Sequence, residues 1–94
     1  MRITRKFLSV KHNNYENEIN DIKKSLFALN LKIKASYNSM SIEEYDKYHN
    51  IRKDLEGIEI MLELGSSTEV KRLMLFMSEN SKDSIPASIF NLIK

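Results

Sequence analysis

Two apolar stripes of matching period constrain the fold of this chain more than any other feature of its sequence. Apolar residues recur at intervals of 4-3-4-3-4 over residues 15–33 and of 3-4-3-4 over residues 48–62. This is the period of helices that pack side by side, whereas a strand requires alternation of apolar and polar residues. The stripes consist of Tyr15, Ile19, Ile22, Leu26, Leu29 and Ile33, and of Tyr48, Ile51, Leu55, Ile58 and Leu62. They predict helices over about 14–36 and 41–64.

The same stripes predict how the two helices pair. Residues 36–40 join them, and a connection this short makes two helices antiparallel neighbours. When the chain folds back at this point, Ile22 faces Leu55, Leu26 faces Ile51, and the remaining stripe positions meet in the same register. Because one register satisfies the whole seam, the sequence predicts an antiparallel helical hairpin.

Capping signals mark the ends of both predicted helices. Asn13 with Glu16, and Ser41 with Glu44, have the spacing of capping boxes, in which side chain and backbone exchange hydrogen bonds at a helix start. Gly65 stands where the second helix should stop, because glycine adopts the left-handed conformation without a Cβ clash. These signals support the predicted bounds of the hairpin.

Outside the seam, both helices carry a second apolar line. It consists of Phe27, Leu31 and Ala35 on the first helix and of Ile60, Met61 and Leu64 on the second. A hairpin with apolar side faces needs a third layer to cover them. We predict a helix over about 67–78 as that layer, and we expect Gly57 to permit a close crossing between helices.

Residues 66–78 contain more apolar side chains than one helix face can bury. The helical stripe consists of Val70, Leu73, Met74 and Met77. Leu75 and Phe76 widen the apolar surface beyond that stripe, and Ser66 with Glu69 has the spacing of another capping box. The helix is therefore either buried on most sides or presents a surface to a partner, and both interpretations stay open here.

The last part of the chain is predicted to contain a polar linker and a final helix. The linker covers residues 78–84, and the helix covers about 85–93 with Pro86 in its first turn. Its apolar face consists of Ile85, Ile89, Phe90 and Ile93. With 94 residues, 41% of them hydrophobic and 30% charged, we expect a single all-α domain, a small helical bundle over residues 1–94.

Residues that carry enzyme chemistry are scarce. The chain has no cysteine, which excludes disulfides, thiolate metal sites and cysteine nucleophiles. Two histidines, His12 and His49, are far apart in the sequence, and two glycines cannot form a glycine-rich phosphate loop. Glu59 and Glu63 are spaced i,i+4 but lack the Glu-x-x-His pattern of di-iron bundles. We therefore expect neither an enzyme nor a bound cofactor or metal.

The distribution of charge separates the two ends of the predicted hairpin. At the loop end, Lys32 and Lys34 should lie beside acidic residues, namely Glu43, Glu44 and Asp46. At the open end, acidic residues of both helices should meet, namely Glu16, Glu18, Asp21, Glu56, Glu59 and Glu63. The basic arm formed by residues 1–12, another copy of the protein or a basic partner could neutralise that end. We expect the arm to dock there, since it is tethered nearby. No apolar run approaches the roughly 20 residues of a membrane span, and we expect a cytoplasmic protein that does not bind membranes.

The C-terminal segment resembles the end of a known family. Asp83, Ile85, Pro86 and Ser88, with the residues after them up to Lys94, follow the D-x-I-P-x-S tail of the Hha/YmoA family of small helical nucleoid-associated modulators. Phe90 stands where that family usually has tryptophan, and the long hairpin departs from its pattern. This resemblance implies a role in modulating transcription, but it covers about an eighth of the chain, and we assign the whole chain to no family.

Our expectation for function is a small non-enzymatic accessory or regulatory protein that binds another protein, as an inhibitor or adaptor, and self-associates. Its composition, rich in Lys, Asn, Ile and Ser, suggests an AT-rich genome, as in many phages and mobile elements. The predicted partner-binding residues are Leu75, Phe76, Ile89 and Phe90. A nucleic-acid-binding regulator is the alternative, and a structural coiled-coil protein is a third. The residues predicted for the nucleic-acid alternative are Arg2, Arg5, Lys6, Lys11, Lys71 and Arg72.

Overall fold

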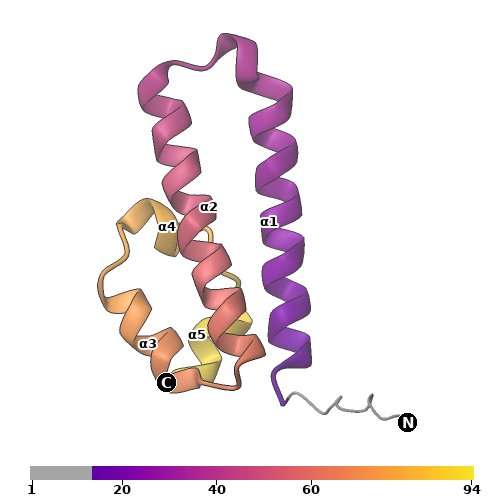
Figure 1. Cartoon of the computed structure of the whole chain (residues 1–94), viewed down its shortest axis with the longest axis vertical. Helices are drawn as coiled ribbons and strands as arrows, with labels where there is room; N and C mark the ends of the chain where they lie inside the picture. Colours follow the sequence, from indigo (N-terminus) through magenta and orange to yellow (C-terminus); the bar gives the residue numbers. More distant parts are fainter. Residues whose placement is uncertain (1–13) are drawn as a thin grey trace, which may run out of the picture.

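A long antiparallel helical hairpin organises the structure. The computed structural model describes residues 14–94, and every regular element in that range is a helix (Figure 1). Helix α1 (Glu16–Ser36) and helix α2 (Ile42–Glu63) are joined by one 3₁₀ turn, η2 (Tyr37–Ser39). Three shorter helices follow: α3 (Ser67–Leu75), α4 (Glu79–Asp83) and α5 (Ala87–Leu92). The predicted all-α hairpin bundle is confirmed, and the bounds of both long helices agree with the prediction to within two residues.

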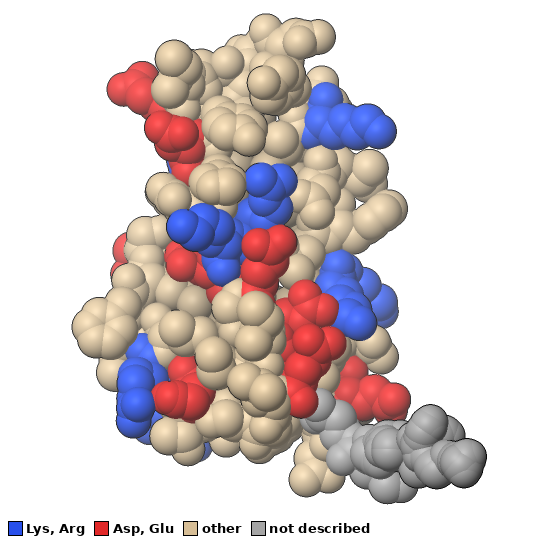
Figure 2. Space-filling model, viewed as in Figure 1, with Lys and Arg blue, Asp and Glu red and all other residues tan. Residues whose placement is uncertain are grey.

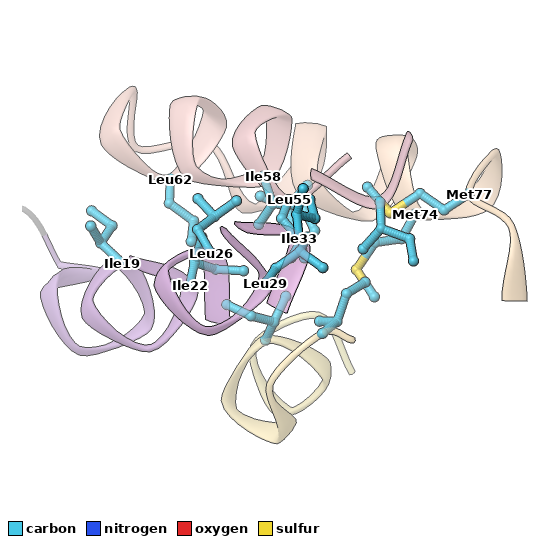
Figure 3. Packing of buried hydrophobic residues seen from close by; sticks show 14 residues of the cluster. Ile19, Ile22, Leu26, Leu29, Ile33, Leu55, Ile58, Leu62, Met74 and Met77 are labelled. Atoms are coloured by element: carbon cyan, nitrogen blue, oxygen red, sulfur yellow. The ribbon is translucent and has the colours of Figure 1, made fainter. Parts of the chain in front are cut away.

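The core lies along the predicted seam. Every aliphatic residue of the two stripes is buried, and Tyr15 and Tyr48 are partly buried against the same cluster. Ile22, Leu55 and Ile58 have 0% of their surface exposed. Figure 3 shows the labelled side chains of α1 and α2 directed toward each other between the two helices. Burial of these apolar surfaces is what holds the hairpin closed.

The N-terminal caps of the two long helices differ. At α2 the predicted capping box is present, because Ser41 Oγ accepts from the Glu44 N–H (3.1 Å) and Glu44 Oε1 accepts from the Ser41 N–H (3.3 Å). Helix α1 instead begins at Glu16, with Tyr15 as N-cap and no side-chain cap hydrogen bond. The box predicted for Asn13 and Glu16 is therefore wrong, since Glu16 is the first helical residue and not the third; Asn13 itself lies outside the described residues.

Gly65 ends α2 as predicted and turns the chain into α3. Its φ is +80°, and its N–H donates to the Leu62 carbonyl, while the Ser66 N–H donates to the Met61 carbonyl (2.9 Å each). These two bonds form a Schellman motif. Ser66 Oγ then accepts from the Glu69 N–H (3.2 Å) and caps α3. One three-residue turn thus lays α3 back against α2.

Gly57 lies where α3 packs against α2. A Cβ added at Gly57 would lie 3.5 Å from Leu73 Cδ1, which is ordinary van der Waals contact. The close approach is therefore to α3, and it leaves room for a methyl group.

Gly57→Ala is accordingly expected to raise the free energy of unfolding by about 0.5–1 kcal/mol, because alanine removes the entropic cost of a mid-helix glycine. Urea denaturation monitored by circular dichroism measures this change. Gly65→Ala is the matched control, and we expect it to lower stability by about 1–2 kcal/mol because an L-residue is strained at positive φ. A loss of stability in Gly57→Ala would show that the contact with Leu73 cannot accept the extra methyl group.

Helix α3 is shorter than predicted, and the segment predicted as a linker contains a helix. Helix α3 ends at Leu75, not near 78, because the N–H groups of Phe76 and Met77 bond three residues back and tighten the turn. Residues 79–83 then form α4, whose N-cap Ser78 accepts from the Ser81 N–H (3.2 Å). Polar side chains are typical of linkers, but in this segment they serve as helix caps and tertiary contacts. Polarity alone therefore could not distinguish a linker from a short helix.

Two hydroxyl groups tie the short helices to the hairpin. Ser81 is fully buried and donates to Asp54 Oδ2 on α2 (2.5 Å). Ser88, on α5, donates to Asp21 Oδ2 on α1 (2.7 Å). Helix α5 begins at Ala87 with Pro86 as its N-cap, so it is shorter than the predicted 85–93.

The short helices cover the second apolar line of the hairpin only in part, since Met61 is the one large residue of that line that is partly buried against the core. Phe27 and Leu31 on α1, and Ile60 and Leu64 on α2, remain exposed. The reason is where α3, α4 and α5 pack: α3 and α4 contact α2 on the side of Gly57 and Asp54. Figure 1 shows them gathered beside the lower half of the hairpin, with the loop end projecting beyond them.

Candidate protein-binding surface

A shallow apolar hollow lies between α2 and α3. Its volume is about 250 Å³, and it is lined by Met61, Glu69, Arg72, Leu73 and Phe76. Leu75 lies next to Phe76 at the end of α3 and is also exposed. We call these six residues the α3 surface.

The amphipathic pattern of α3 explains why the surface forms. Val70, Met74 and Met77 point into the core and are buried. One helix face cannot also bury the neighbouring residues, so Leu75 and Phe76 are 72% and 86% exposed. The structure therefore excludes one of the two interpretations left open by the sequence, because Leu75 and Phe76 do not fill the core.

An ion pair forms the polar side of the hollow. Arg72 Nη1 lies 2.9 Å from Glu69 Oε1 and donates to Glu69 Oε2 at 3.2 Å. Glu69 is in the first turn of α3 and Arg72 in the last, so both charges suit the helix dipole. Figure 2 shows acidic and basic side chains next to each other over α3. The α3 surface is thus apolar, with one charge of each sign at its edge.

The other predicted partner-binding residues lie elsewhere. Ile89 is 0% exposed and belongs to the core, so the expectation that it contacts a partner is corrected. Phe90, beside it on α5, is 37% exposed. Of the apolar face predicted for this segment, Ile85 and Ile89 are buried and Phe90 is exposed, because a periodic pattern does not show which side of a six-residue helix meets the hairpin.

The residues of the nucleic-acid alternative are only partly within the structure. The four basic residues of the arm, Arg2, Arg5, Lys6 and Lys11, lie outside the described residues, as does the predicted docking of that arm. Lys71 and Arg72 are exposed on α3. Arg72 is already paired with Glu69, which offsets its charge.

The charge pattern of the hairpin differs from the prediction. Among the ion pairs of residues 14–94, none joins Lys32 or Lys34 to the acidic residues at the loop end. Lys32 Nζ instead lies 5.0 Å from the centroid of the Tyr48 ring, a cation–π contact. Glu43, Glu44 and Asp46 are exposed, and an ion pair between exposed side chains contributes little to stability.

At the open end, Glu59 and Asp21 have partners within the described part of the chain. Lys23 Nζ lies 3.8 Å from Glu59 Oε2, and Asp21 accepts the hydrogen bond from Ser88. Acidic side chains nonetheless gather on the lower part of the molecule in Figure 2.

His49 has structural contacts. Its Nδ1 lies 3.0 Å from Arg52 Nη2, which donates to it, and its ring stacks on Tyr45 at 6.1 Å between centroids. Arg52 Nη1 also donates to Asn30 on α1 (3.2 Å), so this group links the two long helices. Within residues 14–94, no three acidic or histidine side chains are grouped so that they could hold a metal ion.

Sequence reasoning missed two parts of the surface of this protein. Met61 and Glu69 were noted, as an apolar side-line residue and as a capping residue, but their meeting in one hollow depends on how α3 folds back. A second hollow of about 350 Å³ lies at the loop end, and Tyr37, Met40 and Ile42 help to line it. Loop residues have no periodicity, so no sequence signal pointed to it.

The fold and the α3 surface define a helical-hairpin bundle with an exposed apolar site. Comparison of the chain with protein-family models, curated proteins and solved structures gives no match. None of the helices within residues 14–94 is both long and apolar enough to cross a membrane.

Proposed function

We propose that this protein is a non-enzymatic accessory or regulatory protein that acts by binding another protein through the α3 surface. The observation that carries the proposal is the exposure of Leu75 and Phe76 beside an apolar hollow. Isolated apolar residues are normal on protein surfaces, but a group of large ones beside a concave site marks a place where a partner binds.

The size and chemistry of the hollow favour a protein over a small ligand. Its volume of about 250 Å³ is below the roughly 300–1,000 Å³ of typical small-molecule sites. A hollow of this size suits one side chain of a partner. Aromatic residues, methionine and arginine are enriched in protein interfaces, and Phe76, Met61 and Arg72 all line this one. Methionine also adapts its shape to an irregular partner.

Phe76→Asp, combined with Leu75→Asp, is expected to abolish association while the protein stays folded. Leu75 and Phe76 are exposed to water in the single chain, so aspartates at these positions should not disturb the fold. Burying the two carboxylates in an apolar interface would cost far more free energy than leaving them in water. Affinity capture by the tagged full chain from a lysate, with and without nuclease, measures the loss, and circular dichroism checks the fold.

Leu31→Asp combined with Ile60→Asp is the matched control, since both residues are exposed and apolar but lie on the hairpin outside the α3 surface. We expect it to leave capture unchanged. Loss of helicity in the α3 variant would assign its residues to the core and contradict the proposal. Capture that disappears with nuclease would favour the nucleic-acid alternative, with an affinity that falls steeply as salt rises.

A further inference from the structure

We propose that the partner of the α3 surface is a second copy of this chain, related to the first by two-fold symmetry, so that Phe76 of each copy enters the hollow of the other. The inference rests on the proposed function and names its partner. Two observations carry it: the α3 surface has an exposed aromatic side chain beside a hollow, and it carries one charge of each sign.

The shape of the surface places a projection beside a hollow. Phe76 is 86% exposed and also forms one wall of the hollow, whose apolar remainder is Met61 and Leu73. In a two-fold interface the same patch is used by both copies, so each residue that enters the partner is matched by the partner's own. A patch with both parts therefore binds its copy through two equal contacts at once.

The charge of the surface has the same property. Glu69 and Arg72 lie one turn apart on α3, and their charges cancel. When two α3 helices pack antiparallel, Glu69 of each can lie opposite Arg72 of the other, and both contacts form together. A patch with charges of one sign would repel its own copy.

The register that pairs these charges also brings the apolar residues together. With residue 69 opposite residue 72, the position opposite Phe76 is Gly65, at the turn between α2 and α3. Leu64, next to Gly65, is exposed in the single chain, and Met61 lies one turn earlier on α2. In this register Phe76 of the second copy lies over the end of the hollow formed by Met61 and Glu69, each about one turn from Gly65, and the same arrangement covers Leu64.

The size of the contact predicts a weak dimer. Helix α3 has nine residues, and the hollow accepts one side chain from each copy. The area of such an interface is at the low end for specific interfaces, so we expect a dissociation constant of the homodimer in the micromolar range.

Charge reversal tests the arrangement. Glu69→Arg leaves two arginines at the paired positions, and Arg72→Glu leaves two glutamates, so each variant should repel its own copy. We expect each to raise the dissociation constant of the homodimer at least about tenfold. An equimolar mixture of the two should form a heterodimer, and the double reversal should restore the homodimer. Sedimentation velocity of the full chain across a concentration series measures all four.

Lys71→Glu is the matched control, because it reverses an exposed charge of the same helix that does not line the hollow. We expect it to leave the dimer unchanged, and circular dichroism should show equal helicity in every variant. Equal weakening by Lys71→Glu would indicate an effect of net charge and would overturn the inference. Dimerisation unaffected by both single reversals, or a mixture that fails to pair, would also overturn it.

The outcomes separate this inference from the proposed function. A wild-type chain that stays monomeric at hundreds of micromolar overturns the inference. If the Phe76 variant then still loses a captured protein, the proposed function stands with another partner. If the wild-type chain stays monomeric and the variant with Phe76→Asp and Leu75→Asp captures the same proteins as the wild type, both the inference and the proposed function fail.

Discussion

Leu55→Ala is expected to lower the free energy of unfolding by about 3–5 kcal/mol. Leu55 lies at the middle of the seam with 0% of its surface exposed, in the same cluster as Ile22 and Ile58. Truncation removes buried methyl groups and leaves a cavity between two long helices. The helices cannot move together to fill this cavity, because the rest of the seam holds them in place. A domain of this size is stable by only about 5–14 kcal/mol, so the variant should lose a large part of its stability.

Thermal unfolding measures this effect. A loss of 3 kcal/mol corresponds to a fall in melting temperature of more than about 10 °C for a domain of this length. Leu31→Ala is the matched control, because it makes the same chemical change at an exposed position on α1. We expect it to change stability by less than about 0.5 kcal/mol. Equal effects of the two variants would contradict the seam as the centre of the core.

Ile89→Ala is expected to have the second largest effect, a loss of about 2–5 kcal/mol. Ile89 is fully buried on α5, although its sequence position also suits a partner-facing residue. With only six residues, α5 has little intrinsic stability, so its burial against the hairpin is what holds it in place. Loss of Ile89 should therefore release α5 along with the hydrogen bond from Ser88 to Asp21.

Urea denaturation checks this prediction, with Ile42→Ala as the matched control at an exposed position. The control should change stability by less than about 0.5 kcal/mol. In the Ile89→Ala variant, the amount of partner bound should fall only in proportion to the fraction of unfolded protein. If the Ile89→Ala variant is folded and as stable as the wild type but associates more weakly, Ile89 contacts the partner and the assignment of this residue to the core is wrong.

Short sequence motifs correctly predicted the features that are formed by residues close together in the chain. The capping box of Ser41 with Glu44 and the stop at Gly65 involve residues within a few positions of each other, and both are present in the structure. The signals failed where a contact crosses the fold. Ser81 reads as part of a polar linker, and its role appears only when Asp54, far away in the sequence, lies beside it.

The candidate site was predictable in part. Leu75 and Phe76 exceed what one helix face can bury, so the sequence alone raises them as surface candidates, and their exposure in the structure agrees. The hollow formed by Phe76, Leu73 and Met61 was not predictable, because it requires the angle at which α3 returns against α2. That angle follows from the turn at Gly65 together with the contact between Gly57 and Leu73.

The sequence by itself determined the hairpin, because the period of a buried stripe is a property of each helix and one register satisfies both stripes. Only the tertiary structure decided which of the remaining apolar residues are buried. Ile89 lies in the core, while Phe27 and Phe76 remain exposed, although all three are apolar residues on or beside amphipathic helices. Burial depends on where the other helices pack, and a periodic pattern within one helix carries no information about its neighbours.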